Sequence, residues 1–166
     1  MPILMIVTGF IALSLNAAIF GFFYAWVCST MWGLDVVNPA VAIEAMQAMN
    51  ASVRNGVFAL SFFGTAPALV LAALVAWWAK RRSSALCFAA AAVIYLGGAV
   101  LLTMQIHVPM NTELAMLEPA ELGDAAARIW AEYSPPWQFW NAVRAAVCWV
   151  ALMITGAGLL AMRPRD

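Results

Sequence analysis

Apolar residues dominate four long stretches of this 166-residue chain, and polar residues gather in the segments between them. A hydrocarbon core roughly 30 Å thick is crossed by about 20 apolar residues in a helix. We therefore predict four membrane-spanning helices, at about residues 3–28, 57–79, 84–106 and 137–162. The chain shows no repeat and no second domain, so we expect an all-α, polytopic membrane four-helix bundle that covers residues 1–166.

The placement of basic residues predicts how the bundle is oriented. Lys80, Arg81 and Arg82 fill the short 80–83 connection, and two further arginines follow the last span. Basic residues in short loops mark the cytoplasmic side. We therefore expect both termini inside the cell, in the inner membrane of a bacterium. The two longer loops, 29–56 and 107–136, would lie outside.

Both outer loops contain patterns typical of short helices. In the first loop, Asn38 can cap a helix that has Pro39 in its first turn and ends at Asn55-Gly56. Its polar residues follow spacings of 3, 3 and 4 and form one stripe: Glu44, Gln47, Asn50 and Arg54. This stripe either faces water on an interfacial helix or turns over the bundle to line a cavity. In the second loop, the segment DAAARIWAEY predicts another helix, with Asp124 as its N-cap.

Composition narrows the class further, because 66% of the residues are hydrophobic and only 10% are charged. Soluble domains average about 45–50% apolar and about 25% charged residues. The net charge is zero, so we expect no nucleic-acid partner. A single histidine excludes bis-His haem, three-His zinc and two-His iron sites from this chain alone, and we expect no metal and no cofactor.

We interpret the cysteines and tryptophans mainly as structural residues. The three cysteines show no paired spacing, and a Cys28–Cys148 disulfide would need both residues near one face of the membrane. Tryptophans near span ends are typical of the aromatic belts at membrane interfaces. We place Trp77 and Trp78 at the inner interface, and at the outer one Trp26, Trp32, Trp137 and Trp140.

Arg144 is the main anomaly of the fourth span. It lies seven residues beyond Trp137, which is about 10 Å along a helix at 1.5 Å per residue. An arginine at mid-bilayer costs about 2.5–3.5 kcal/mol on insertion scales. Helical spacing puts it on one face with Trp137, Asn141 and Cys148. The side chain either lines an internal polar cavity or pairs with a carbonyl or a carboxylate, for which Glu44 and Glu113 are candidates.

His107 lies at the outer end of the third span, just before a proline expected to help end that helix. One reading is that it marks where the helix leaves the membrane. The other is that it faces Asn141 and Arg144, which should sit at a similar depth on the fourth span.

The order of several short segments resembles that of the anthrone oxygenase-like family of small four-helix membrane proteins. The matching segments are AMQAMN with Asn55 and Phe58 downstream, then VPMN, WAEY and WQFWNAVR. Three positions depart from the family pattern. Gly56 replaces a usual proline, Ala142 stands where histidine is frequent, and His107 stands where asparagine is frequent. Either an imidazole has changed position or the activity is absent.

The resemblance implies oxygenation of a polyketide anthrone to an anthraquinone without metal or flavin. A base would remove an acidic C–H proton, and the resulting anion would react directly with O2. An imidazole titrates near neutral pH and suits this base. The candidate catalytic residues are His107, Asn111, Asn141 and Arg144. The candidate ligand-binding residues are Gln47, Asn50, Arg54, Trp137 and Trp140.

Two functions remain open at this point. The chain is an enzyme or binder for a small hydrophobic or aromatic ligand, with a polar cavity under its outer loops. Alternatively, it is an accessory subunit packed against a larger membrane protein complex. An enzyme needs its polar residues to converge around an open volume, whereas an accessory subunit would fill that volume with side chains.

Overall fold

The computed structural model describes residues 2–162, which are almost entirely helical and contain no strand. Four continuous helical segments are long and apolar enough to cross a membrane, as predicted. They cover Ile3–Asp35, Gly56–Trp78, Arg82–Ala115 and Ala125–Leu160. The prediction of an all-α bundle with four spans is therefore confirmed, although three of the four helices are longer than expected.

The helical segments include turns of π-helix as well as α-helix. The first span joins α1 (Pro2–Ala25), the π-helix η1 (Trp26–Thr30) and α2 (Met31–Asp35). The third joins α5 (Arg82–Tyr95), the π-helices η2 (Leu96–Leu101) and η3 (Thr103–His107), and α6 (Val108–Ala115). The remaining elements are α3 (Pro39–Ser52), α4 (Gly56–Trp78), the short 3-10 helix η4 (Pro119–Glu121) and α7 (Ala125–Leu160).

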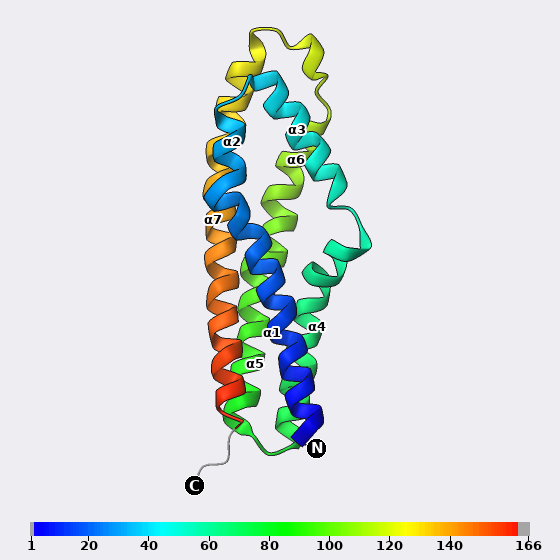
Figure 1. Ribbon diagram of the computed structural model, residues 1–166, viewed down its shortest axis with the longest axis vertical. Coiled ribbons are helices and arrows are strands. Elements are labelled where there is room, and N and C mark those ends of the chain that lie inside the picture. The colour runs from blue at the N-terminus through cyan, green and yellow to red at the C-terminus, as the bar shows by residue number, and fades with distance from the viewer. Residues whose placement is uncertain (1, 163–166) are drawn as a thin grey trace.

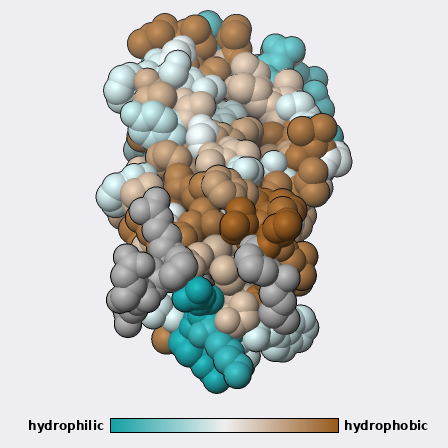
Figure 2. All heavy atoms as spheres, turned by 60° about the horizontal axis from the view of Figure 1, so that its bottom comes forward, coloured by the Kyte–Doolittle hydropathy of each residue, from teal (hydrophilic) through white to brown (hydrophobic). Residues whose placement is uncertain are grey.

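The four long helices pack as an antiparallel ring in which α1 and α5 each lie between α4 and α7. The helix α1 begins, and α7 ends, at the same end of the bundle as the α4–α5 connection (Figure 1). Figure 2 shows a hydrophilic patch at this end, where Lys80 and Arg81 lie in the connection and Arg82 begins α5. That this end faces the cytoplasm stays a prediction from the basic residues.

The core between the long helices is apolar and contains a few buried polar groups, of which the Asn16 side-chain oxygen and the Ser84 hydroxyl have no partner within residues 2–162. Phe62, Phe88 and Tyr95 are fully buried, and the Tyr95 hydroxyl donates to the Phe62 carbonyl at 2.7 Å. Asn16 donates to the Thr155 hydroxyl at 3.4 Å, which is the interhelical hydrogen bond expected of such a residue in lipid. The cysteines are free, with Cys28 exposed and Cys148 buried, so they do not pair.

The helix α3 lies over the end of the bundle opposite the α4–α5 connection, which is called the outer end after its predicted orientation. There it packs on a second apolar cluster with α6 and α7. Asn38 caps it as predicted, since its side-chain oxygen accepts from the Ala40 amide at 3.0 Å. The helix ends at Ser52, earlier than expected. Asn55 instead caps α4, accepting from the amides of Val57 and Phe58.

The prolines do not end the helices where the sequence predicted. Pro109 follows the π-helical turn η3 and occupies the first turn of α6, where a missing N–H is tolerated. Pro135 and Pro136 lie inside α7, which runs unbroken from the second outer loop into the membrane. The separate helix expected after Asp124 is therefore the first part of α7, and the Asp124 side chain makes no capping bond.

A glycine pair on the third helix offers a matched test of this packing. A Cβ atom on Gly98 would lie 2.4 Å from the Val147 Cγ1 atom of α7, whereas one on Gly97 would meet nothing within 4 Å. Valine is stiff at χ1, so its side chain cannot swing away easily. We expect Gly98→Ala to lower the free energy of unfolding in detergent by about 1–3 kcal/mol. Gly97→Ala should not lower it, and equal losses in the two variants would contradict the close contact between η2 and α7.

Candidate functional site

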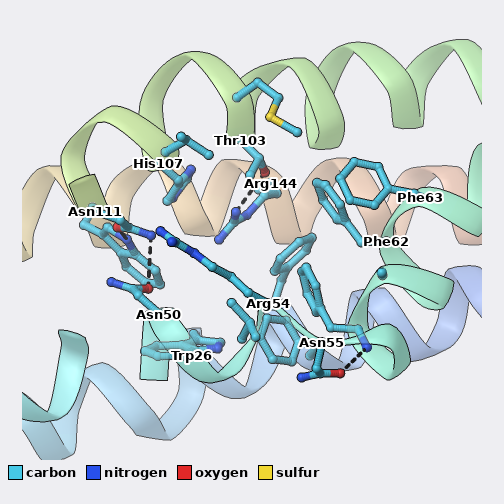
Figure 3. A pocket seen from close by; sticks show the side chains of 18 of the residues that line it. Trp26, Asn50, Arg54, Asn55, Phe62, Phe63, Thr103, His107, Asn111 and Arg144 are labelled. Carbon is cyan, nitrogen blue, oxygen red and sulfur yellow. Dashed lines mark hydrogen bonds between the residues drawn. The ribbon is translucent and has the colours of Figure 1, made fainter. Parts of the chain in front are cut away.

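The outer half of the bundle encloses a cavity of about 490 Å³ under α3. Its wall is built by α1 and η1 on one side, α4 on another, and η3, α6 and α7 opposite them (Figure 3). Most of the lining is apolar, and seven aromatic rings contribute to it: Phe22, Phe23, Trp26, Phe58, Phe62, Phe63 and Trp137. Figure 3 also shows polar side chains that point into the same space.

The cavity opens where α4 and the third helix diverge. Phe63 is 52% exposed, and Met104 and Val108 are each 43% exposed, although all three line the cavity. The segment between α3 and α4 forms another part of the rim, with Arg54 and Asn55 exposed. The mouth therefore combines apolar side chains of the membrane-spanning helices with an arginine at their outer ends.

Arg144 lies at the inner end of the polar lining and is only 5% exposed. Its guanidinium donates to the Thr103 hydroxyl at 2.9 Å and to the Asn141 side-chain oxygen at 2.7 Å. It also lies 3.9 Å above the centre of the Phe23 ring. The expectation that Arg144 lines a cavity therefore agrees with the structure. Its hydrogen-bond partners are neutral, and neither Glu44 nor Glu113 is among them.

Asn111 connects the outer helices to the cavity wall. Its side-chain oxygen accepts from the Tyr133 hydroxyl at 2.8 Å and from the Trp137 indole at 3.0 Å. Its amide nitrogen donates to the side-chain oxygen of Asn50 at 3.0 Å. Because both donors come from α7 and the acceptor from α3, Asn111 holds three elements in register. Its side-chain oxygen therefore already accepts two hydrogen bonds from the protein.

His107 is buried, with 1% of its surface exposed, and its ring meets that of Trp137 edge to face at 5.2 Å. It lies at the end of the π-helical turn η3, and such turns are frequent at functional sites. The imidazole faces the cavity, not the headgroups, which answers the question that its position in the sequence raised (Figure 3).

Several buried polar atoms of the cavity wall have no hydrogen-bond partner within residues 2–162. They are both ring nitrogens of His107, the Asn50 amide nitrogen and the Arg144 Nε atom. Buried polar groups are almost always paired, so each unpaired one needs an explanation. These three side chains line one cavity. The Asn50 amide nitrogen and the Arg144 Nε atom are donors, and a neutral imidazole adds one donor and one acceptor nitrogen. The arrangement suits a ligand with oxygen acceptors.

The structure brings together six of the nine residues proposed from the sequence. The lining includes Asn50, Arg54, His107, Asn111, Trp137 and Arg144. Gln47 does not take part, because it donates to the carbonyls of Leu114 and Leu117 and ties α3 to the end of α6. Asn141 lies behind Arg144, where its amide donates to the Phe23 carbonyl. Trp140 contacts Phe139 and is also absent from the lining.

Some lining residues were not predicted. Trp26 was assigned to the outer aromatic belt, but it is 8% exposed and packs against Trp137 with ring centroids 5.1 Å apart. Thr103 lies one helical turn before His107 and had no separate signal. The i,i+4 spacing of Phe58 and Phe62 could have indicated a shared aromatic face. Inside an apolar span, however, such spacing does not distinguish a cavity wall from a lipid-facing surface.

These features define a class of protein: a membrane-spanning helical bundle with an aromatic cavity, rich in hydrogen-bond donors, at one end. The family model described as anthrone oxygenase matches residues 57–154, more than half of the chain. The chain therefore belongs to the anthrone oxygenase family, as the order of its motifs had suggested. No match was found among curated proteins or among solved structures. The matched range contains His107 and Arg144 but not the α3 side of the cavity.

The bond between Thr103 and Arg144 provides a test of the polar wall. Thr103→Val keeps the shape of the side chain but leaves a buried guanidinium N–H unpaired, which should cost about 1–3 kcal/mol of unfolding free energy. Thr112→Val is the matched control, since the exposed Thr112 hydroxyl donates only to the Val108 carbonyl of its own helix. Thermal or denaturant unfolding in detergent measures both. Equal stability of the two variants would contradict the Arg144 arrangement.

Proposed function

We propose that the protein is a cofactor-independent oxygenase for planar aromatic substrates whose acidic C–H group is conjugated through aromatic rings with a carbonyl, as in an anthrone. The observation that carries the proposal is the buried imidazole of His107, unpartnered, in the same aromatic cavity as the buried guanidinium of Arg144. Family membership supports the same reaction class. In this proposal the base comes from position 107, because Ala142 stands where histidine is frequent in the family.

The first step is proton abstraction by His107. A general base must have a nitrogen lone pair within reach of the substrate, and neither ring nitrogen is bonded to another described residue. The edge-to-face contact with Trp137 holds the ring in one orientation. Loss of the C–H proton leaves an enolate that is conjugated with the aromatic rings.

The second role falls to the donors around the developing oxyanion. The Arg144 Nε atom and the Asn50 amide nitrogen both lack partners and belong to the lining. Donors fixed before the reaction stabilise the anion more than mobile water does, because they need no reorganisation. Thr103 and Asn141 hold the guanidinium in place, so Asn141 acts as a positioning residue and does not touch the substrate.

The anion then reacts with O2. Electron transfer from the carbanion to O2 and recombination form a C–O bond, and His107 returns its proton to the resulting peroxide. Loss of the second C–H proton with O–O cleavage expels hydroxide, which becomes water on taking up that proton. One oxygen atom of O2 thus becomes the new carbonyl and the other leaves as water. The substrate supplies all the electrons, so no other reductant is consumed.

The size and chemistry of the cavity favour this function over that of an accessory subunit. A volume of about 490 Å³ lies in the usual range of small-molecule sites, roughly 300–1,000 Å³. A subunit whose only role is packing would have no need of unpaired donors around an open volume. Purification from the native membrane distinguishes an enzyme from an accessory subunit. Co-purification with a larger complex in fixed stoichiometry would favour the subunit.

Oxygen consumption with an anthrone tests the proposed base. We expect His107→Ala to lower kcat by at least about 100-fold, the usual contribution of a general base. His107→Gln keeps a polar side chain of similar size and should be equally slow, because it cannot take up a proton. Unfolding temperatures of both variants show whether the fold is intact.

Glu132→Gln is the control for surface charge, since Glu132 is exposed on α7 outside the cavity lining. Its turnover should equal that of the wild type. If folded His107→Ala consumed O2 at the normal rate, His107 would not be the base and the mechanism would fail.

A further inference from the structure

The charges around the cavity are all of one sign. Two arginines, Arg54 and Arg144, are among the lining residues, all of which lie in the described part of the chain, and no aspartate or glutamate accompanies them. The nearby Asp35 carboxylate is occupied at the α2–α7 contact, where Trp130, Ser134 and Gln138 donate to it. The cavity therefore holds cationic groups without carboxylates of its own.

The two arginines occupy different places. Arg144 is buried and bonded to Thr103 and Asn141, so its position is fixed at the inner end of the cavity. Arg54 follows the end of α3, is exposed, and points across the cavity toward Asn111 and His107 (Figure 3). Its guanidinium makes no hydrogen bond to another described side chain. One arginine can thus meet the reacting end of a ligand and the other its outer end.

We propose that the ligand is a planar aromatic acid whose carboxylate binds Arg54 at the mouth of the cavity. This inference rests on the proposed function for the aromatic part of the ligand and adds an acidic substituent that binds Arg54. Arginine is the side chain that matches a carboxylate with two parallel hydrogen bonds.

An aromatic body fits the cavity better than an alkyl chain does. Phe58 and Phe62 stack with ring centroids 5.3 Å apart at 14°, and Trp26 of η1 and Trp137 of α7 also line the cavity. Flat rings gain from stacked and edge-to-face contacts with such side chains, whereas a flexible chain loses rotational freedom on binding. The apolar rim of Phe63 and Met104 admits the ring system, while its carboxylate stays with Arg54.

Binding of oxidised analogues under anaerobic conditions tests the inference without turnover. The probes are anthraquinone-2-carboxylate and its methyl ester, which share one ring system and differ in charge. We expect the wild type to bind the carboxylate about tenfold more tightly than the ester, as one charge-assisted pair should provide. Arg54→Gln should abolish this preference and leave ester binding unchanged, and Arg54→Lys should keep part of it.

Arg128→Gln is the matched control, because it removes the same charge from an exposed site on α7 outside the lining. It should retain the full preference. Equal binding of carboxylate and ester by the wild type, or a preference that survives in Arg54→Gln, would overturn the proposal. Tighter binding of palmitate than of anthraquinone-2-carboxylate would assign the site to a lipid acid instead. Normal turnover by His107→Ala would defeat the proposed base but not the carboxylate preference.

Discussion

The outer half of this molecule is organised around a cation that lies inside a bundle of apolar helices. A buried guanidinium loses its hydration, and the protein must replace it with hydrogen bonds and aromatic faces. Thr103 on the third helix, Asn141 on α7 and the Phe23 ring on α1 together provide this environment. Since Asn141 also donates to the Phe23 carbonyl, the residues that solvate Arg144 link three helices.

A second network holds the outer helices over this centre. Asn111 receives bonds from Tyr133 and Trp137 and gives one to Asn50, so α6, α7 and α3 meet at one amide. The Asp35 carboxylate, which accepts from Trp130, Ser134 and Gln138, joins α2 to α7 in the same way. These two networks join α2, α3, α6 and α7 at the outer end, and the cavity remains open between the long helices below them.

The sequence predicted the candidate site better than it predicted the element boundaries. Arg144 and His107 stood out because a polar group in or beside an apolar span is costly unless it has a polar environment, and Asn50 stood out because it belongs to the polar stripe of the first loop. The end of the third helix was missed because a π-helical turn places Pro109 where helix geometry accepts it. The aromatic wall was missed because a phenylalanine side chain packs equally well against lipid and against a ligand. Gln47 and Trp140 were also predicted to bind the ligand, but Gln47 donates to the Leu114 carbonyl and Trp140 packs against Phe139.

The sequence by itself determined the class, the four spans and the presence of polar residues that no bilayer would leave unpaired, because each follows from transfer free energies along the chain. The tertiary structure alone decided which of those residues share a cavity. Convergence depends on helix rotation, on the π-helical turn that precedes Pro109, and on the way α3 folds back over the bundle. These are set by packing between distant segments, which the order of residues does not display.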